Sequence, residues 1–180
     1  MRRHALVLTG LMAGVCFLLA IGTATVTAGT FTVNTTDDTD DGKCDVNHCS
    51  LREAINAANS NLGADTIEFN IPKADSGYSV GVSGTWTISL TSSLPSLFDD
   101  ETTIAGDTQA AFIGVDLNPL GPEIEITGAS LGSGSCLSVN SDQNKIRGLV
   151  INRCPHDGIL IGIGGDANVI SGNYIGTDAT

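Results

Sequence analysis

The spacing of apolar residues predicts one short amphipathic helix in the first third of the chain. Five apolar residues recur at helical spacing with polar residues between them: Leu51, Ala54, Ile55, Ala58 and Leu62. Ser50 lies three residues before Glu53, which is the spacing of a capping box that pairs the first helical amides. We therefore expect a helix from Leu51 to near Ser60. Because about three helical turns are marginal alone in water, its apolar stripe is expected to cover another part of the fold as a lid.

Outside this helix, apolar and polar residues alternate over short segments, which is typical of strands. The alternation is clearest in Thr30–Asn34, Thr66–Ile71 and Thr85–Leu90. Their apolar side chains are expected to face the core. This expectation includes Trp86, which follows the apolar alternation and is therefore assigned to the core rather than to a sugar-stacking surface.

An isoleucine–any residue–glycine triplet recurs in the second half of the chain. Its isoleucines are 22, 20 and 24 residues apart: Ile104, Ile126, Ile146 and Ile170. A second short apolar element precedes each triplet, around Ile88, Ile113, Leu137 and Ile159. A period in the low twenties made of short strands predicts a parallel β-solenoid in which the four triplet isoleucines stack in one ladder. The triplet glycines then mark bends, and Asn144 and Asn168 stack at a turn and link neighbouring layers.

The segment Cys49–Asn59 (C-S-L-R-E-A-I-N-A-A-N) resembles the signature of the CSLREA family of secreted bacterial and archaeal proteins. The resemblance extends over roughly residues 31–72. It implies a right-handed parallel β-helix, as in pectin-lyase-like proteins, with the helix as an amino-terminal cap. The fold expected is thus all-β, a right-handed parallel β-helix (solenoid) with an amino-terminal α-helical cap. The domains expected are a signal peptide (1–28), the cap region (29–72) and β-helix repeats (73–180).

The first residues have the pattern of a secretory signal peptide. Arg2 and Arg3 precede an apolar stretch, and Val26–Ala28 fits a cleavage site, so we expect secretion to the exterior or the cell surface with no stable membrane span in the mature chain. The formal net charge of −12 argues against nucleic acid as a partner. The chain stops at residues 177–180 inside a repeat, and we therefore expect it to continue beyond them.

The cysteines suggest one local disulfide. Cys44 and Cys49 flank a short loop before the helix, and in an oxidising compartment we expect them to be bonded. With His48 they are too few for a structural zinc site, so no metal ligands are assigned. A bond between Cys136 and Cys154 is possible but not favoured, because the expected repeat does not stack them.

The acidic loop before the helix partly follows a calcium-loop pattern. Its oxygen-bearing and turn residues are Asp37, Thr39, Asp41, Gly42 and Asp45. The third ligand position is threonine, and His48 stands where the last acidic ligand is required. A solvated charged turn is therefore preferred, with no cofactor assigned and calcium as the alternative.

No catalytic motif is recognisable in the sequence, and no catalytic residue is assigned. Glu123 and Glu125 lie on one face of a strand but are expected to be solvated, and the bases Lys145, Arg147 and Arg153 have no accompanying aspartate cluster. The function expected is a non-catalytic secreted or surface scaffold for adhesion or for binding a polysaccharide or cell-surface glycan. The alternative is the amino-terminal part of a pectate-lyase-like polysaccharide lyase or hydrolase.

Overall fold

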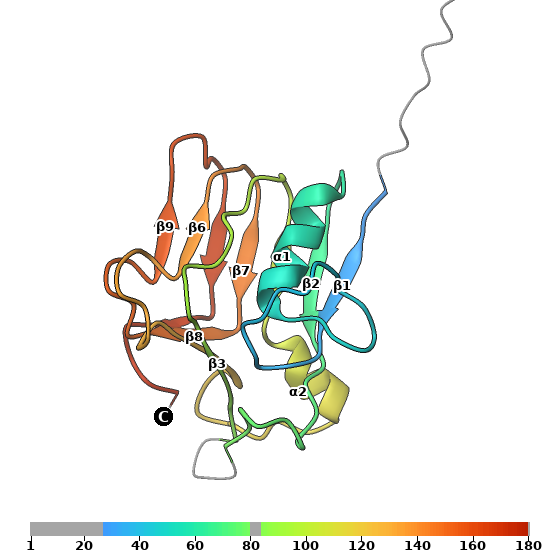
Figure 1. The fold of residues 1–180 in the computed structure, drawn as a ribbon. Helices are drawn as coiled ribbons and strands as arrows, with labels where there is room; N and C mark the ends of the chain where they lie inside the picture. Colours follow the sequence, from blue (N-terminus) through green and yellow to red (C-terminus); the bar gives the residue numbers. More distant parts are fainter. Residues whose placement is uncertain (1–26, 80–83, 180) are drawn as a thin grey trace, which may run out of the picture.

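The computed structural model describes residues 27–79 and 84–179, and Figure 1 shows their arrangement. Residues 1–26 of the predicted signal peptide lie outside the described residues. The helices and strands, in chain order, are β1 (Thr30–Val33), α1 (Leu51–Ser60), β2 (Thr66–Phe69), β3 (Trp86–Ser89), β4 (Thr103–Ala105), α2 (Thr108–Ile113), β5 (Ile124–Thr127), β6 (Leu137–Val139), β7 (Lys145–Arg147), β8 (Leu149–Asn152), β9 (Ile159–Ile161), β10 (Val169–Ser171) and β11 (Tyr174–Ile175).

The described strands form three parallel sheets. Sheet A has the order β1-β2-β4-β7-β10, sheet B the order β11-β8-β5-β3, and sheet C contains β6 and β9. Neighbouring strands in each sheet come from successive passes of the chain, so every pairing joins residues distant in sequence. The strands are only two to four residues long, which leaves more than half of the described chain in turns and loops.

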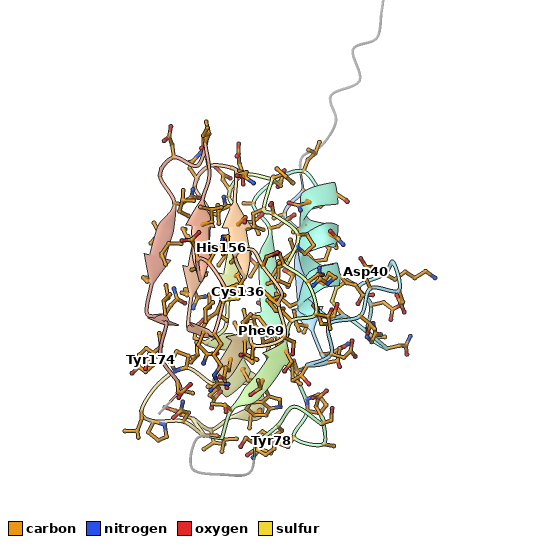
Figure 2. The ribbon with its side chains drawn as sticks, turned by 60° about the vertical axis from the view of Figure 1, so that its left-hand side comes forward. Asp40, Phe69, Tyr78, Cys136, His156 and Tyr174 are labelled. Atoms are coloured by element: carbon orange, nitrogen blue, oxygen red, sulfur yellow. A yellow bond between two sulfur atoms is a disulfide. The ribbon has the colours of Figure 1, made fainter. Side chains whose placement is uncertain are left out.

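The core lies between the sheets and is built from the apolar residues of each alternation. In sheet A, Ile67 pairs with Ile104 and Ile104 pairs with Ile146, and all three side chains are buried. Phe69 at the end of β2 points into this interior (Figure 2). Trp86 is fully buried on sheet B, and its indole N–H donates to the carbonyl of Pro72. The prediction that Trp86 belongs to the core is confirmed.

The predicted all-β, right-handed parallel β-helix is wrong as a description of this structure. The described strands form three separate parallel sheets of five, four and two strands, which are not closed or coiled into a solenoid, and two helices accompany them. One physical reason is the uneven length of the connections. Thr102 hydrogen-bonds to Asn144, 42 residues away, whereas Asn144 hydrogen-bonds to Asn168, 24 residues away. The sequence period in the low twenties therefore does not correspond to one structural repeat.

The predicted ladder of four isoleucines is also wrong in one member. Ile104, Ile146 and Ile170 pair in sheet A, but Ile126 pairs with Ile88 and Ile151 in sheet B.

Ile113, expected in a strand, ends helix α2 instead. Two side chains near the start of this helix bind the end of β2: Thr108 accepts from the amide of Phe69, and Gln109 pairs with both backbone groups of Ile71. Gly114 ends the helix with φ of 77°, a left-handed value that glycine adopts without strain.

Helix α1 spans Leu51–Ser60, and both hydrogen bonds of the predicted capping box are present. Its buried residues face β1 and β2, so the helix covers that end of sheet A (Figure 1). The predicted helix and its role as a cover are confirmed. Leu62 is an exception: it lies beyond the helix end, is 62 % exposed and does not extend the apolar stripe.

Two asparagines join successive passes of the chain at one corner of sheet A. Asn144 accepts from the amide of Thr102, and Asn168 accepts from the amide of Asn144. Asn144 is fully buried, so these bonds satisfy amides that water cannot reach. The predicted structural role of Asn144 and Asn168 is confirmed.

The structure contains two disulfides. Cys44 is bonded to Cys49, the pair expected from the sequence. Cys136 is bonded to Cys154, which the sequence analysis did not favour. The bond forms although the two cysteines do not occupy equivalent positions in the sequence repeat. Cys154 follows β8 and meets Cys136 beside Gly128. A Cβ atom on Gly128 would lie 2.7 Å from the Cys136 sulfur, so a larger residue there would crowd the bond.

Replacing both Cys136 and Cys154 with alanine is expected to lower the free energy of unfolding by about 2–3 kcal/mol. The bond closes a loop with a sequence separation of 18, and its loss allows the unfolded chain more conformations. Urea denaturation monitored by tryptophan fluorescence measures the change. An unchanged midpoint would show that this bond does not constrain the unfolded chain.

Within residues 27–79 and 84–179, no helix combines the length and hydrophobicity needed to cross a membrane. The two disulfides are compatible with an extracellular location.

Candidate functional site

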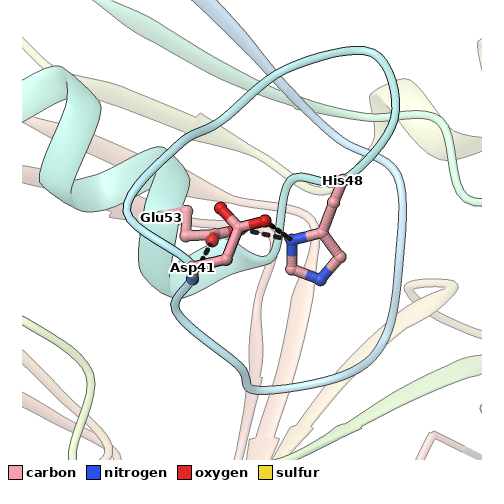
Figure 3. Close-up of side chains that lie close together, drawn as sticks. All are labelled: Asp41, His48 and Glu53. Atoms are coloured by element: carbon pink, nitrogen blue, oxygen red, sulfur yellow. Dashed lines mark hydrogen bonds and ion pairs between the residues drawn. The ribbon is translucent and has the colours of Figure 1, made fainter.

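The acidic loop folds back over the first turn of α1 and places His48 beside a buried carboxylate. Glu53, in the first turn, is 2 % exposed, and its two oxygens accept from the amides of Asp41 and Ser50. The Cys44–Cys49 disulfide closes the loop immediately beside His48. The folded loop thus brings together Asp41, His48 and Glu53, which are called here the histidine–carboxylate cluster (Figure 3).

Three atoms of the histidine–carboxylate cluster converge on one point. His48 Nδ1 lies 2.9 Å from Glu53 Oε2 and 3.9 Å from Asp41 Oδ2. This nitrogen is buried and makes no hydrogen bond within the described residues. The other ring nitrogen, Nε2, lies 3.1 Å from a carboxylate oxygen of Asp37. Both ring nitrogens of His48 therefore face carboxylates.

The acidic surroundings shift two pKa values. Burial of the imidazole opposes its protonation, but the hydrogen bond and charge of Asp37, together with the charges of Glu53 and Asp41, outweigh it and raise the pKa of His48. The pKa of Asp37 is lowered to about 2: burial opposes ionisation, and hydrogen bonds from Thr39, Thr35 and His48 outweigh it. The loop thus favours a positive charge between its carboxylates.

The residues of the calcium pattern do not converge. Asp37 accepts from Thr35 and Thr39 and contacts His48, whereas Asp45 accepts from the amides of Asn47 and His48 in its own turn. Gly42 adopts φ of 88° at the loop turn. Of the residues in the calcium pattern, only Asp41 belongs to the histidine–carboxylate cluster.

A second polar region lies on the solvent side of sheet A. It is a groove of about 480 Å³, called here the sheet A groove, and it is lined by Ala64, Asp65, Thr66, Glu101, Thr103, Gln143, Lys145 and Ala167. Thr66 pairs with Thr103, and Thr103 pairs with Lys145, so these three side chains form a row across β2, β4 and β7. Within the described residues Lys145 makes no ion pair, and its ammonium group is available to a ligand.

The backbone at the rim of the sheet A groove is unusual. Glu101, Gln143 and Ala167 adopt φ values of 63°, 59° and 56°, which residues other than glycine rarely do. These turns are held one above another, since Glu101 donates to the carbonyl of Asp142 and Gln143 donates to the carbonyl of Asp166. Repeated left-handed turns therefore fix the polar side chains of Glu101 and Gln143 at the groove.

Asp65 adds a buried acceptor at the floor of the sheet A groove. It is 1 % exposed, and its Oδ1 accepts from the amide of Gly29 and the side-chain amide of Asn61. Its Oδ2 has no hydrogen-bond partner within the described residues. Burial and the charge of Asp65 raise the pKa of nearby Asp99. Asp65 is thus a buried carboxylate beneath the groove, and the groups that face a ligand are the hydroxyls and the ammonium group of the lining.

A further groove, of about 620 Å³, lies between β1 and the disulfide loop. Phe31 and Val46 contribute apolar surface to it, and Thr32 and Asn34 contribute polar groups. It is called here the β1 groove. It differs from the sheet A groove because no row of paired polar side chains crosses it.

The remaining charged residues weighed in the sequence have structural partners. Arg147 pairs with Asp107, and Arg153 pairs with Asp178. Glu125 accepts from Thr87 and Asn152.

The expectation that Glu123 is solvated is wrong, because it is 5 % exposed and accepts from the amide of Leu117. Burial of Glu123 raises its pKa, the Leu117 amide opposes the rise, and the charge of Asp116 adds to it.

Glu123→Gln is expected to stabilise the protein at neutral pH more than at acid pH. A raised carboxyl pKa means that ionising Glu123 costs stability; the cost is absent below the unfolded-state pKa, near 4.5, and complete above the raised folded-state pKa. Glutamine keeps an oxygen for the Leu117 amide and removes the charge. Thermal melts of both proteins at pH 3.5 and pH 7.5 measure the difference. An equal effect at the two pH values would contradict the assignment.

Sequence reasoning missed both polar regions. Glu53 was recognised as a capping residue and His48 as a loop residue, but their contact depends on how the loop folds over α1. The sheet A groove depends on which strands pair. Left-handed backbone at Glu101, Gln143 and Ala167 has no sequence signal, since none of these is the glycine or asparagine that usually marks it.

Comparison of the sequence with protein-family models and with curated proteins found no match. The likeness of Cys49–Asn59 to the CSLREA signature therefore stays a resemblance.

Proposed function

We propose that this protein is a non-catalytic extracellular module that binds polysaccharide in the sheet A groove. The observation that supports it most is the row Thr66, Thr103 and Lys145, in which paired residues present two hydroxyls and one ammonium group to solvent. Adjacent strands lie about 4.8 Å apart, so the row offers donors at regular intervals. A glycan chain presents hydroxyl oxygens at repeating positions and suits such a row.

The size and lining of the groove also support a sugar ligand. Its volume of about 480 Å³ falls within the range of roughly 300–1,000 Å³ in which small ligands bind. The lining is mainly polar. The groove contains both negative groups, Asp65 and Glu101, and a positive group, Lys145, so its surface does not carry charge of a single sign. These features favour hydroxyl recognition over binding of a highly charged polymer.

Location at the exterior is part of the proposal. The signal-like residues 1–28, the two disulfides and the resemblance to a secreted family support it. Whether the protein is released or stays at the cell surface is a question that cell fractionation answers.

Binding to a polysaccharide panel, followed by titration calorimetry with each bound sugar, tests the proposal. Lys145→Ala removes the ammonium donor and is expected to weaken binding about tenfold or more, since hydrogen bonds to charged groups contribute roughly 1.5–3 kcal/mol. Lys73→Ala is the matched control, because Lys73 is exposed on a loop outside the groove. Binding that is equally strong in both variants would refute the groove as the site.

The same samples separate binding from degradation. A lyase or hydrolase releases new chain ends during incubation, which a reducing-end assay detects. We expect none within a day with any sugar that binds. Release that disappears in a Glu101→Gln variant would replace the binding proposal with an enzymatic one.

A further inference from the structure

The histidine–carboxylate cluster gathers three potential metal ligands around one nitrogen of His48. His48 Nε2 faces Asp37, while His48 Nδ1 faces both Glu53 and Asp41. If Nε2 carries the ring proton and donates to Asp37, the lone pair of Nδ1 points toward two carboxylates. That arrangement is repulsive unless a positive charge, either a second proton on the ring or a bound metal ion, lies among the three groups.

The distances are those of a metal site that needs little adjustment. Asp41, His48 and Glu53 each offer one ligand atom, and these atoms lie within 4.8 Å of one another. With metal–ligand bonds of about 2.0–2.2 Å, two ligands of a tetrahedral ion lie roughly 3.3–3.6 Å apart. The separations from His48 Nδ1, 2.9 Å to Glu53 and 3.9 Å to Asp41, lie on either side of this range.

The surrounding hydrogen bonds match those that orient metal ligands. A ligating histidine usually donates its other ring N–H to a carboxylate, and Asp37 occupies that position. The Glu53 carboxylate is fixed by the amides of Asp41 and Ser50, which leaves a lone pair on Oε2 for an ion. His48 and Glu53 are thus held in place by the fold before any ion arrives, whereas the Asp41 side chain is largely exposed.

Solvent lies close to the cluster at Glu53 and at Asp41. A cavity of about 390 Å³ lies against Glu53 and is bordered by Asp40, Lys43 and Asn56. The side chain of Asp41 is 61 % exposed, so its carboxylate can exchange water for an ion. Water entering from either side supplies the fourth ligand that three protein groups leave open.

We propose that Asp41, His48 and Glu53 bind a first-row divalent transition-metal ion, with Zn²⁺ as the representative, and that the ion fastens the acidic loop to α1. One imidazole nitrogen and two carboxylate oxygens suit such an ion better than Ca²⁺, which takes 6–8 oxygen ligands. The disulfide between Cys44 and Cys49 occupies the two thiols that would otherwise compete for it.

Zinc titration of protein stripped with a chelator tests this proposal. Calorimetry is expected to give one site per chain, and thermal melting is expected to shift upward with Zn²⁺ but not with equimolar Ca²⁺. His48→Gln and Asp41→Asn each remove one ligand and should abolish the shift. Both residues are partly exposed, so the variants are expected to fold, which circular dichroism checks.

His156→Gln provides the matched control, because His156 lies in an exposed turn beside Asp157 and far from α1 in the sequence. Its zinc response should equal that of the unaltered protein. No heat and no thermal shift, or a response that survives in both His48→Gln and Asp41→Asn, would overturn the proposal. A response lost only in His156→Gln would also overturn it and place the ion in the other turn.

Discussion

Ile146→Ala is expected to lower the free energy of unfolding by about 2–5 kcal/mol. Ile146 is fully buried in β7, the fourth of the five strands of sheet A, where it pairs with Ile104 on one side and Ile170 on the other. Shortening the side chain loses the transfer free energy of the removed carbons and leaves a cavity between Ile104 and Ile170. Because sheets A and B share one core, the remaining side chains have little freedom to close it.

Lys145→Ala is the matched control for this prediction. Lys145 precedes Ile146 on β7, is exposed and points to the other face, so the same truncation should cost under roughly 0.5 kcal/mol. Urea denaturation of both variants gives the two free energies. Similar values for Lys145→Ala and Ile146→Ala would contradict the register of β7, since a slip by one residue exchanges the two faces.

Glu53→Ala is expected to lower the free energy of unfolding by about 3–5 kcal/mol. The variant leaves two amides without acceptors, those of Ser50 and Asp41, and it removes the buried partner of His48. The buried amide of Ser50, left unsatisfied, costs about 1–3 kcal/mol. The loss frees the acidic loop from α1, so the helix should fray and expose the end of sheet A that it covers.

Ser50→Ala separates the capping contribution from the role of the buried carboxylate. The Ser50 hydroxyl accepts from the amide of Glu53 and donates to the carbonyl of Thr39, so its loss should cost only about 0.5–2 kcal/mol. Chelator-treated protein should be used, so that a bound ion does not contribute. A Glu53→Ala effect no larger than that of Ser50→Ala would mean that the loop is not anchored through Glu53.

Local signals were sufficient for some elements. The capping box at Ser50 and Glu53 and the apolar stripe of α1 predicted the helix within its observed bounds, because capping and amphipathicity depend on neighbouring residues. Alternation correctly predicted which side chains of β1, β2 and β3 face inward, including Trp86.

The sequence pattern did not predict which distant segments pair with each other. Ile126 has the same local motif as Ile104, yet it belongs to another sheet, because loop lengths decide which passes of the chain meet. The same limit explains why the Cys136–Cys154 bond and the α2 contacts of Gln109 were missed. The proposed function depends on strand pairing, since the row across the sheet A groove exists only through it.

Hydrogen–deuterium exchange with and without a bound polysaccharide tests the proposed function most directly. We expect the ligand to slow exchange in β2, β4 and β7 and in the turns at Glu101 and Gln143, which form the sheet A groove and its rim. Amides of sheet C, on β6 and β9, serve as the internal reference and should be unaffected. Protection confined to the β1 groove around Phe31 and Val46, or to any other surface, would contradict the account.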